Sequence, residues 1–111
     1  MLILYLSAFQ HWMDHANLKE LISVDLDSSD NITEEVLFNF VNTYGPQLQG
    51  LGLSGMPHVT DGLWNSIFSK LKSAKILVMG TSDRMTVKIH VDHLVDGMAK
   101  NCADLERLEF R

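Results

Sequence analysis

Two short groups of histidines have the residue types and the spacing that could bind a metal ion. His11 and His15 are four residues apart, so both rings could lie on one side of a helix. A zinc protease would also need a glutamate directly after the first histidine, and this chain has Trp12 there. The second group, His90-Val91-Asp92-His93, is a single short cluster for which the sequence suggests no distant ligand. We therefore expect no metal site.

The single cysteine and the paired glycines do not complete a catalytic or cofactor-binding motif. Cys102 is the one cysteine of the chain, which excludes an internal disulfide and suits a reducing compartment. Its place in the repeat described below is a buried one, where a thiol is usually inert. Gly50-Leu51-Gly52 lies inside an expected strand and is not followed directly by a helix, unlike a phosphate-binding loop. We therefore expect no enzymatic activity and no cofactor.

A repeated phrase positions these residues. Strand-like segments occur at residues 21–26, 48–53, 74–79 and 105–110, and their last apolar residue recurs at intervals of 27, 26 and 31 residues. Six residues after the first three of these apolar residues comes an apolar–threonine pair: Ile32-Thr33, Val59-Thr60 and Met85-Thr86. Self-similarity at such a period is typical of solenoid repeats, in which stacked units share one core.

A helix is expected after each of the first three strands. Fifteen apolar positions recur at the same offsets, on one face of each helix: Val36, Leu37, Phe40, Val41 and Tyr44; Leu63, Trp64, Ile67, Phe68 and Leu71; Leu94, Val95, Met98, Ala99 and Cys102. Thr33 and Thr60 precede acidic residues and are expected to cap their helices; Asp83 or Thr86 would do so in the third copy.

These elements predict an α/β fold in which parallel strands line the inside of a right-handed solenoid and helices cover the outside. Residues 18–111 would form about three repeats and a final strand. Residues 1–17 would form an N-terminal helix that covers the first repeat or belongs to a preceding one. The final strand lacks a cap, so we expect either a longer repeat array or a partner at that edge.

The phrase resembles the cysteine-containing subclass of leucine-rich repeats, whose pattern is C-x-x-L-x-x-L-x-L followed by I-T-D-x-x-L. Residues 46–63 and 102–110 carry the likeness, whereas Leu18 and Leu71 stand where the family has cysteine. The resemblance implies a ribonuclease-inhibitor-like leucine-rich repeat solenoid. It also implies the substrate-recognition part of an F-box type ubiquitin ligase component, whose cullin subunits would bind through a region outside this chain. A leucine-rich repeat adaptor or inhibitor-like scaffold with no ubiquitin role is the alternative.

The outward side chains of the strands form the expected partner-binding concave face. From the first strand to the fourth, this face is acidic, then flat where glycines replace side chains, then apolar, then mainly basic. Its residues are Ser23, Asp25, Asp27, Gly50, Gly52, Ser54, Ile76, Val78, Arg107, Glu109 and Arg111. An ordinary sheet surface without a partner is the open alternative, since β-branched residues such as Ile76 simply favour strands.

Charge and hydropathy exclude several other partners. The net charge of −5 disfavours binding to nucleic acid. The apolar N-terminal stretch lacks the basic start and cleavage site of a signal peptide, and it is too short and polar to cross a membrane. We therefore expect an intracellular protein, in the cytoplasm or nucleus, that binds a protein partner and neither nucleic acid nor membrane.

Overall fold

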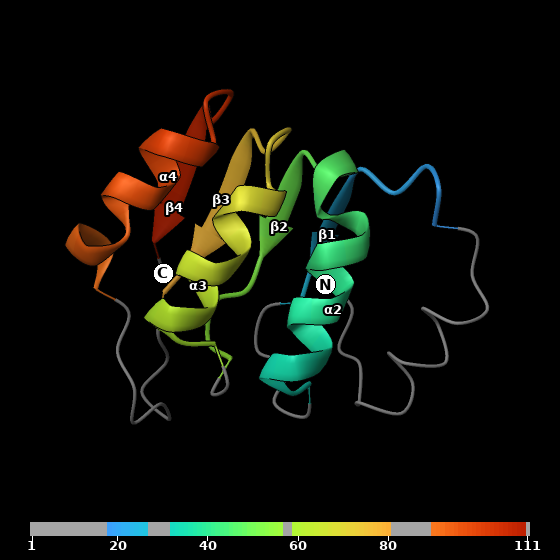
Figure 1. The fold of residues 1–111 in the computed structure, drawn as a ribbon, viewed down its shortest axis with the longest axis horizontal. Coiled ribbons are helices and arrows are strands. Elements are labelled where there is room, and N and C mark those ends of the chain that lie inside the picture. The colour runs from blue at the N-terminus through green and yellow to red at the C-terminus, as the bar shows by residue number, and fades with distance from the viewer. Residues whose placement is uncertain (1–17, 27–31, 57–58, 81–89, 111) are drawn as a thin grey trace.

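The computed structural model describes residues 18–26, 32–56, 59–80 and 90–110 (Figure 1). The predicted N-terminal helix over residues 1–17 therefore lies outside the described residues, as do Asp27 and Arg111 of the predicted binding face. In the described part, helices and strands alternate along the chain, and the predicted α/β class is confirmed.

In the described ranges, four short parallel strands form one sheet in the order in which they occur in the chain. They are β1 (Ser23–Asp25), β2 (Gly50–Gly52), β3 (Ile76–Met79) and β4 (Arg107–Phe110). Val24 pairs with Leu51, Leu51 with Leu77, and Leu77 with Leu108. This is the register that the alignment of the repeated phrase predicts.

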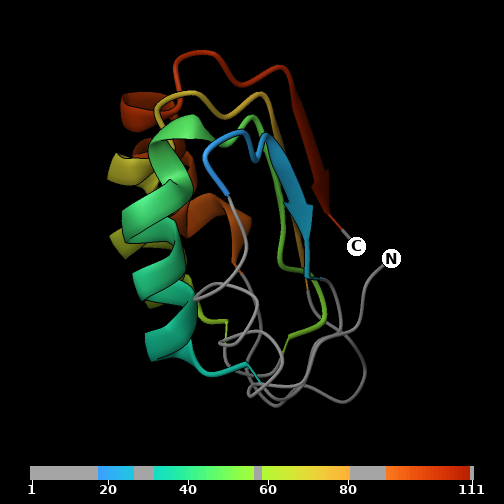
Figure 2. The ribbon, with the colours of Figure 1, turned by 90° about the vertical axis from the view of Figure 1, so that its right-hand side faces the viewer.

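The helices lie on one side of this sheet, and no helix in the described ranges covers the other side (Figures 1 and 2). The α-helices are α2 (Glu34–Tyr44), α3 (Asp61–Ile67) and α4 (Val95–Asn101). The described ranges also contain three short 3₁₀ helices, each next to one α-helix in the chain: η1 (Gly45–Gln47), η2 (Phe68–Lys70) and η3 (Val91–His93).

Two of the predicted helix caps are confirmed. The Val36 N–H donates to Oγ1 of Thr33 over 3.3 Å, and the Leu63 N–H donates to Oγ1 of Thr60 over 3.2 Å. The third cap differs from the prediction, since Leu94 holds the N-cap position of α4 and makes no side-chain hydrogen bond. The 3₁₀ turn η3 leads the chain into α4 instead, and Asp83 and Thr86 lie outside the described residues.

The core fills the space between the sheet and the helices. Its largest fully buried side chains include Trp64, Phe40 and Phe68. All fifteen apolar helix positions are buried or partly buried except Val95 and Ala99 on α4. The exception has a simple cause, because α4 has a neighbouring α-helix on one side only among the described residues (Figure 1).

Side chains in the return turns connect each segment to the one before it. Nε2 of Gln47 donates to the carbonyl oxygens of Leu18 and Leu21, over 2.7 and 2.9 Å. One turn later, Oγ of Ser73 donates to the carbonyl oxygen of Pro46 over 2.9 Å. These side chains therefore tie two successive return turns to the preceding segment.

Candidate functional site

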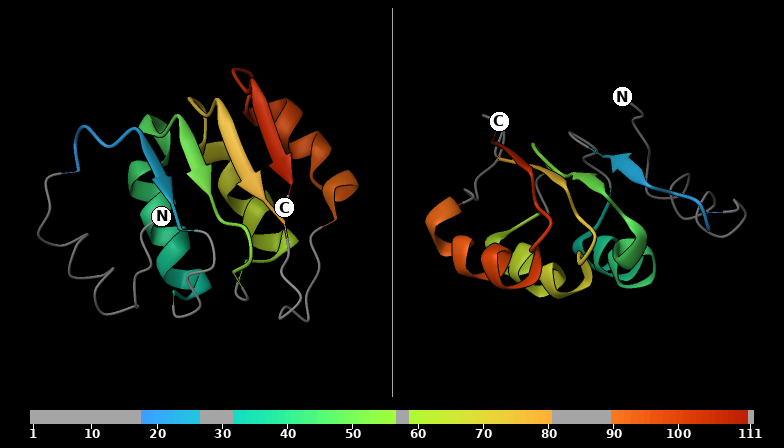
Figure 3. Two further views of the ribbon diagram at one scale, coloured as in Figure 1. Left: turned by 180° about the vertical axis from the view of Figure 1, so that it is seen from behind. Right: turned by 90° about the horizontal axis from the view of Figure 1, so that it is seen from above.

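The face of the sheet opposite the helices holds the residues that the sequence predicts for binding. We call it the open sheet face, seen from that side in the left panel of Figure 3. Side chains alternate along a strand, so every second residue faces away from the helix layer. Its described members are Ser23, Asp25, Gly50, Gly52, Ile76, Val78, Arg107 and Glu109.

A hollow of about 310 Å³ lies on this face over the first three strands. Gly50 and Gly52 contribute no side chains, which leaves the middle strand lower than its neighbours. On one side of it stand Ser23 and Asp25, and on the other stand Ile76 and Val78. The hollow therefore has a backbone floor, one polar wall and one apolar wall.

The apolar wall is partly open to solvent. Ile76 is 39% exposed and Val78 is partly buried, although both lie on a strand with neighbours on either side. The polar wall leans toward the floor: a Cβ atom added to Gly50 would lie 2.8 Å from Oγ of Ser23. A side chain at position 50 would thus fill the hollow or displace Ser23.

The far end of the open sheet face holds Arg107 and Glu109, two of the three residues for which the sequence predicts a mainly basic surface. Nη2 of Arg107 lies 2.8 Å from Oε1 of Glu109 on the same strand. This pair balances one positive charge with one negative charge, and Arg111 lies outside the described residues. The described part of β4 therefore presents an ion pair between an exposed arginine and a partly buried glutamate.

Ser54, which the sequence also places on the binding face, is buried. It is 6% exposed in the turn that follows β2. The turn continues into Gly55, whose φ of 66° is readily adopted by glycine. Ser54 therefore offers little surface to a partner.

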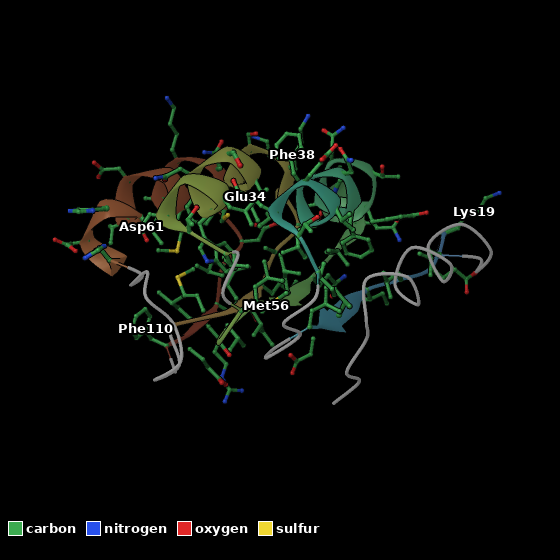
Figure 4. The ribbon with its side chains drawn as sticks, turned by 90° about the horizontal axis from the view of Figure 1, so that it is seen from below. Lys19, Glu34, Phe38, Met56, Asp61 and Phe110 are labelled. Atoms are coloured by element: carbon green, nitrogen blue, oxygen red, sulfur yellow. The ribbon has the colours of Figure 1, made fainter. Side chains whose placement is uncertain are left out.

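A second candidate site consists of one aspartate and two histidines that the sequence analysis treats separately. Oδ2 of Asp61 lies 2.9 Å from Nδ1 of His90 and 3.7 Å from Nδ1 of His93. The two imidazole rings have centroids 5.0 Å apart. Asp61 is the first residue of α3, and the histidines flank and end η3, beside which Figure 4 shows Asp61.

The environment of Asp61 favours the ionised carboxylate. Partial burial would raise its pKa, but the backbone N–H of His90, its imidazole and the positive charges of both histidines together outweigh burial and lower the pKa. The sequence reasoning missed Asp61 as a member of this group. The signal available to it was the apolar–threonine–acid phrase, which places Asp61 at the start of a helix but does not pair it with a histidine.

The other residues considered for catalysis or metal binding are either unreactive or outside the described residues. Cys102 is 4% exposed, and burial raises the pKa of its thiol while Lys72 opposes the change, so the neutral thiol is favoured. His11 and His15 lie outside the described residues. None of the helices in the described part is both long and apolar enough to cross a membrane.

Comparison of the chain with protein-family models, with curated proteins and with solved structures gave no match.

Proposed function

We propose that this chain is a protein-binding scaffold built as a right-handed leucine-rich repeat solenoid. We further propose that it is the substrate-recognition part of an F-box type ubiquitin ligase component. Three features support a repeat architecture: the strands pair in chain order, the helices share one face, and Gln47 and Ser73 make similar hydrogen bonds to the preceding segment.

One observation carries the binding role: the hollow on the open sheet face beside the exposed Ile76. Single exposed apolar side chains such as Phe38 are common on protein surfaces, so the hollow beside Ile76 is what sets this residue apart. The glycine floor also lets a partner's backbone come close to the sheet. These features suit a partner segment that inserts one apolar side chain between Ser23 and Ile76.

Two substitutions on β3 test this surface. Ile76→Asp combined with Val78→Asp places two charges on the apolar wall, where a partner's apolar side chain would lose its contacts. We expect partner recovery, measured by affinity purification with the full-length protein as bait, to fall at least about tenfold, equal to about 1.4 kcal/mol. Circular dichroism and thermal unfolding verify that the double variant is folded.

Phe38→Asp is the matched control, because Phe38 is 38% exposed and lies on α2 in the helix layer. It makes the same kind of change at nearly the same exposure, and partner recovery should be unchanged. If the folded double variant keeps the wild-type partners, the open sheet face is not the binding surface.

The ubiquitin role needs its own test, since a repeat scaffold can bind proteins without it. A cullin and its adaptor should co-purify with the full-length protein, and the Ile76→Asp, Val78→Asp variant should retain them while losing the substrate. If no cullin or adaptor co-purifies but the open sheet face still binds its partner, the alternative remains. In that case the chain is a leucine-rich repeat adaptor or inhibitor-like scaffold with no ubiquitin role.

A further inference from the structure

The geometry points to a divalent metal site of zinc type formed by Asp61, His90 and His93, which is independent of the proposed binding face. Each residue offers one ligand atom, and these atoms all lie within 4.8 Å of one another. Two imidazole nitrogens with one carboxylate oxygen form a ligand set that zinc accepts, with water in the fourth position.

The distances between the ligand atoms fit one ion. With metal–ligand bonds of about 2.1 Å, two ligands of a tetrahedral zinc ion are about 3.4 Å apart. The separations from Oδ2 of Asp61 to the two Nδ1 atoms are 2.9 and 3.7 Å, one slightly below this value and one slightly above. The third separation, between nitrogens of the two histidines, is within 4.8 Å, so the rings must rotate to seat an ion. The histidines are free to do so because their side chains are 53% and 64% exposed.

The carboxylate of Asp61 is already oriented for metal binding. Oδ1 of Asp61 accepts a hydrogen bond from the backbone N–H of His90 over 3.1 Å, so Oδ2 is the atom directed at both rings. Such a hydrogen bond to a metal-binding carboxylate holds it in place and commonly raises metal affinity. The negative charge that Asp61 carries also favours a cation over a neutral ligand.

The site would join two segments that are distant in sequence. Asp61 begins α3, whereas His90 precedes η3 and His93 ends it, 29 residues or more further on. A bound ion would replace one exposed hydrogen bond with three coordinate bonds and fix η3 against α3. The metal would therefore stabilise the start of α4, where the N-cap residue Leu94 makes no side-chain hydrogen bond.

Isothermal titration calorimetry of the full chain with ZnCl₂, without a histidine tag, tests the proposal. We expect one ion per chain, and a Co²⁺ derivative with the intense visible absorption of a tetrahedral site. Asp61→Asn, His90→Gln and His93→Gln should each weaken binding at least about tenfold. His11→Gln with His15→Gln is the matched control and should leave affinity unchanged.

His93→Gln keeps the test decisive, because His93 is the most exposed ligand and its loss should leave the fold intact by circular dichroism. Failure of the wild-type chain to bind Zn²⁺ or Co²⁺ would overturn the proposal. Undiminished binding by folded His93→Gln and His90→Gln variants would overturn it as well.

Discussion

Leu77 of β3 and Leu108 of β4 are partners in the parallel sheet, yet Leu77 is fully buried and Leu108 is 39% exposed. The difference follows from position, because β3 lies between two strands and β4 is at the edge. A hollow of about 390 Å³ lined by Leu108, Met98 and Cys102 lies at this edge. Residues at the same position of the repeat therefore contribute differently to the free energy of unfolding in different copies.

Leu77→Ala should destabilise the fold far more than Leu108→Ala. At the buried position we expect a loss of about 2–5 kcal/mol, because the change removes packing and leaves a cavity. At the edge position we expect about 1 kcal/mol or less. Urea unfolding of both variants measures the difference, and equal losses would show that the β4 edge is covered in solution.

Gly62→Ala and Gly97→Ala should have opposite effects, although both glycines lie in helices. Around position 62 the nearest atom to an added Cβ is Oγ1 of Thr60 at 3.6 Å, so alanine should stabilise by about 0.5–1 kcal/mol. At position 97 the Cβ would lie 2.8 Å from Cδ2 of Phe68, which is fully buried. Alanine there should cost about 1–3 kcal/mol. Thermal unfolding distinguishes the two, and a more stable Gly97→Ala variant would contradict the close approach.

Thr60→Ala should weaken α3 because it removes the hydrogen-bond acceptor for the Leu63 N–H. We expect a loss of about 0.5–2 kcal/mol, with Thr60→Ser close to wild type because serine keeps the hydroxyl. Chemical denaturation of both variants measures the cap. An alanine variant as stable as the serine variant would rule out a stabilising role for the Thr60 hydroxyl.

Asp61→Asn should change how stability depends on pH. The folded-state pKa of Asp61 is lowered, so its stabilising contribution is present above the unfolded pKa of about 3.9 and is lost as the pH falls through the folded pKa. Because the histidines are more than half exposed, the contribution should be at most about 1 kcal/mol. In metal-free buffer, the stability difference between wild type and variant should therefore shrink from pH 5 downward. A difference that grows on acidification would contradict this sign.

The strand register could be predicted from sequence because apolar residues recur at fixed positions. Val24, Leu51, Leu77 and Leu108 stand at the same place in the four copies, and each pairs with the next. Burial of one side of a strand specifies its register strongly, since a slip of one residue would turn every apolar side chain outward.

The candidate metal site could not be predicted in the same way. His90 and Asp61 are 29 residues apart and belong to different copies of the phrase, so their contact depends on the path of the chain between the copies. The third copy is also stretched between Thr86 and Leu94, so the distance from threonine to helix that holds after Thr33 and Thr60 does not locate α4. The burial of Ser54 was also not predicted, because it lies in the turn that follows the strand.

The order of the strands has a consequence for how this protein folds. Each strand pairs with the next one along the chain, and the three pairings connect Ser23 to Gly50, Gly50 to Ile76 and Ile76 to Arg107. Every such loop closes over a similar, moderate length, so no pairing carries a much larger entropic penalty than another. We expect the transition state to form around β2 and β3, which have a strand on either side, and the outer strands to add afterwards.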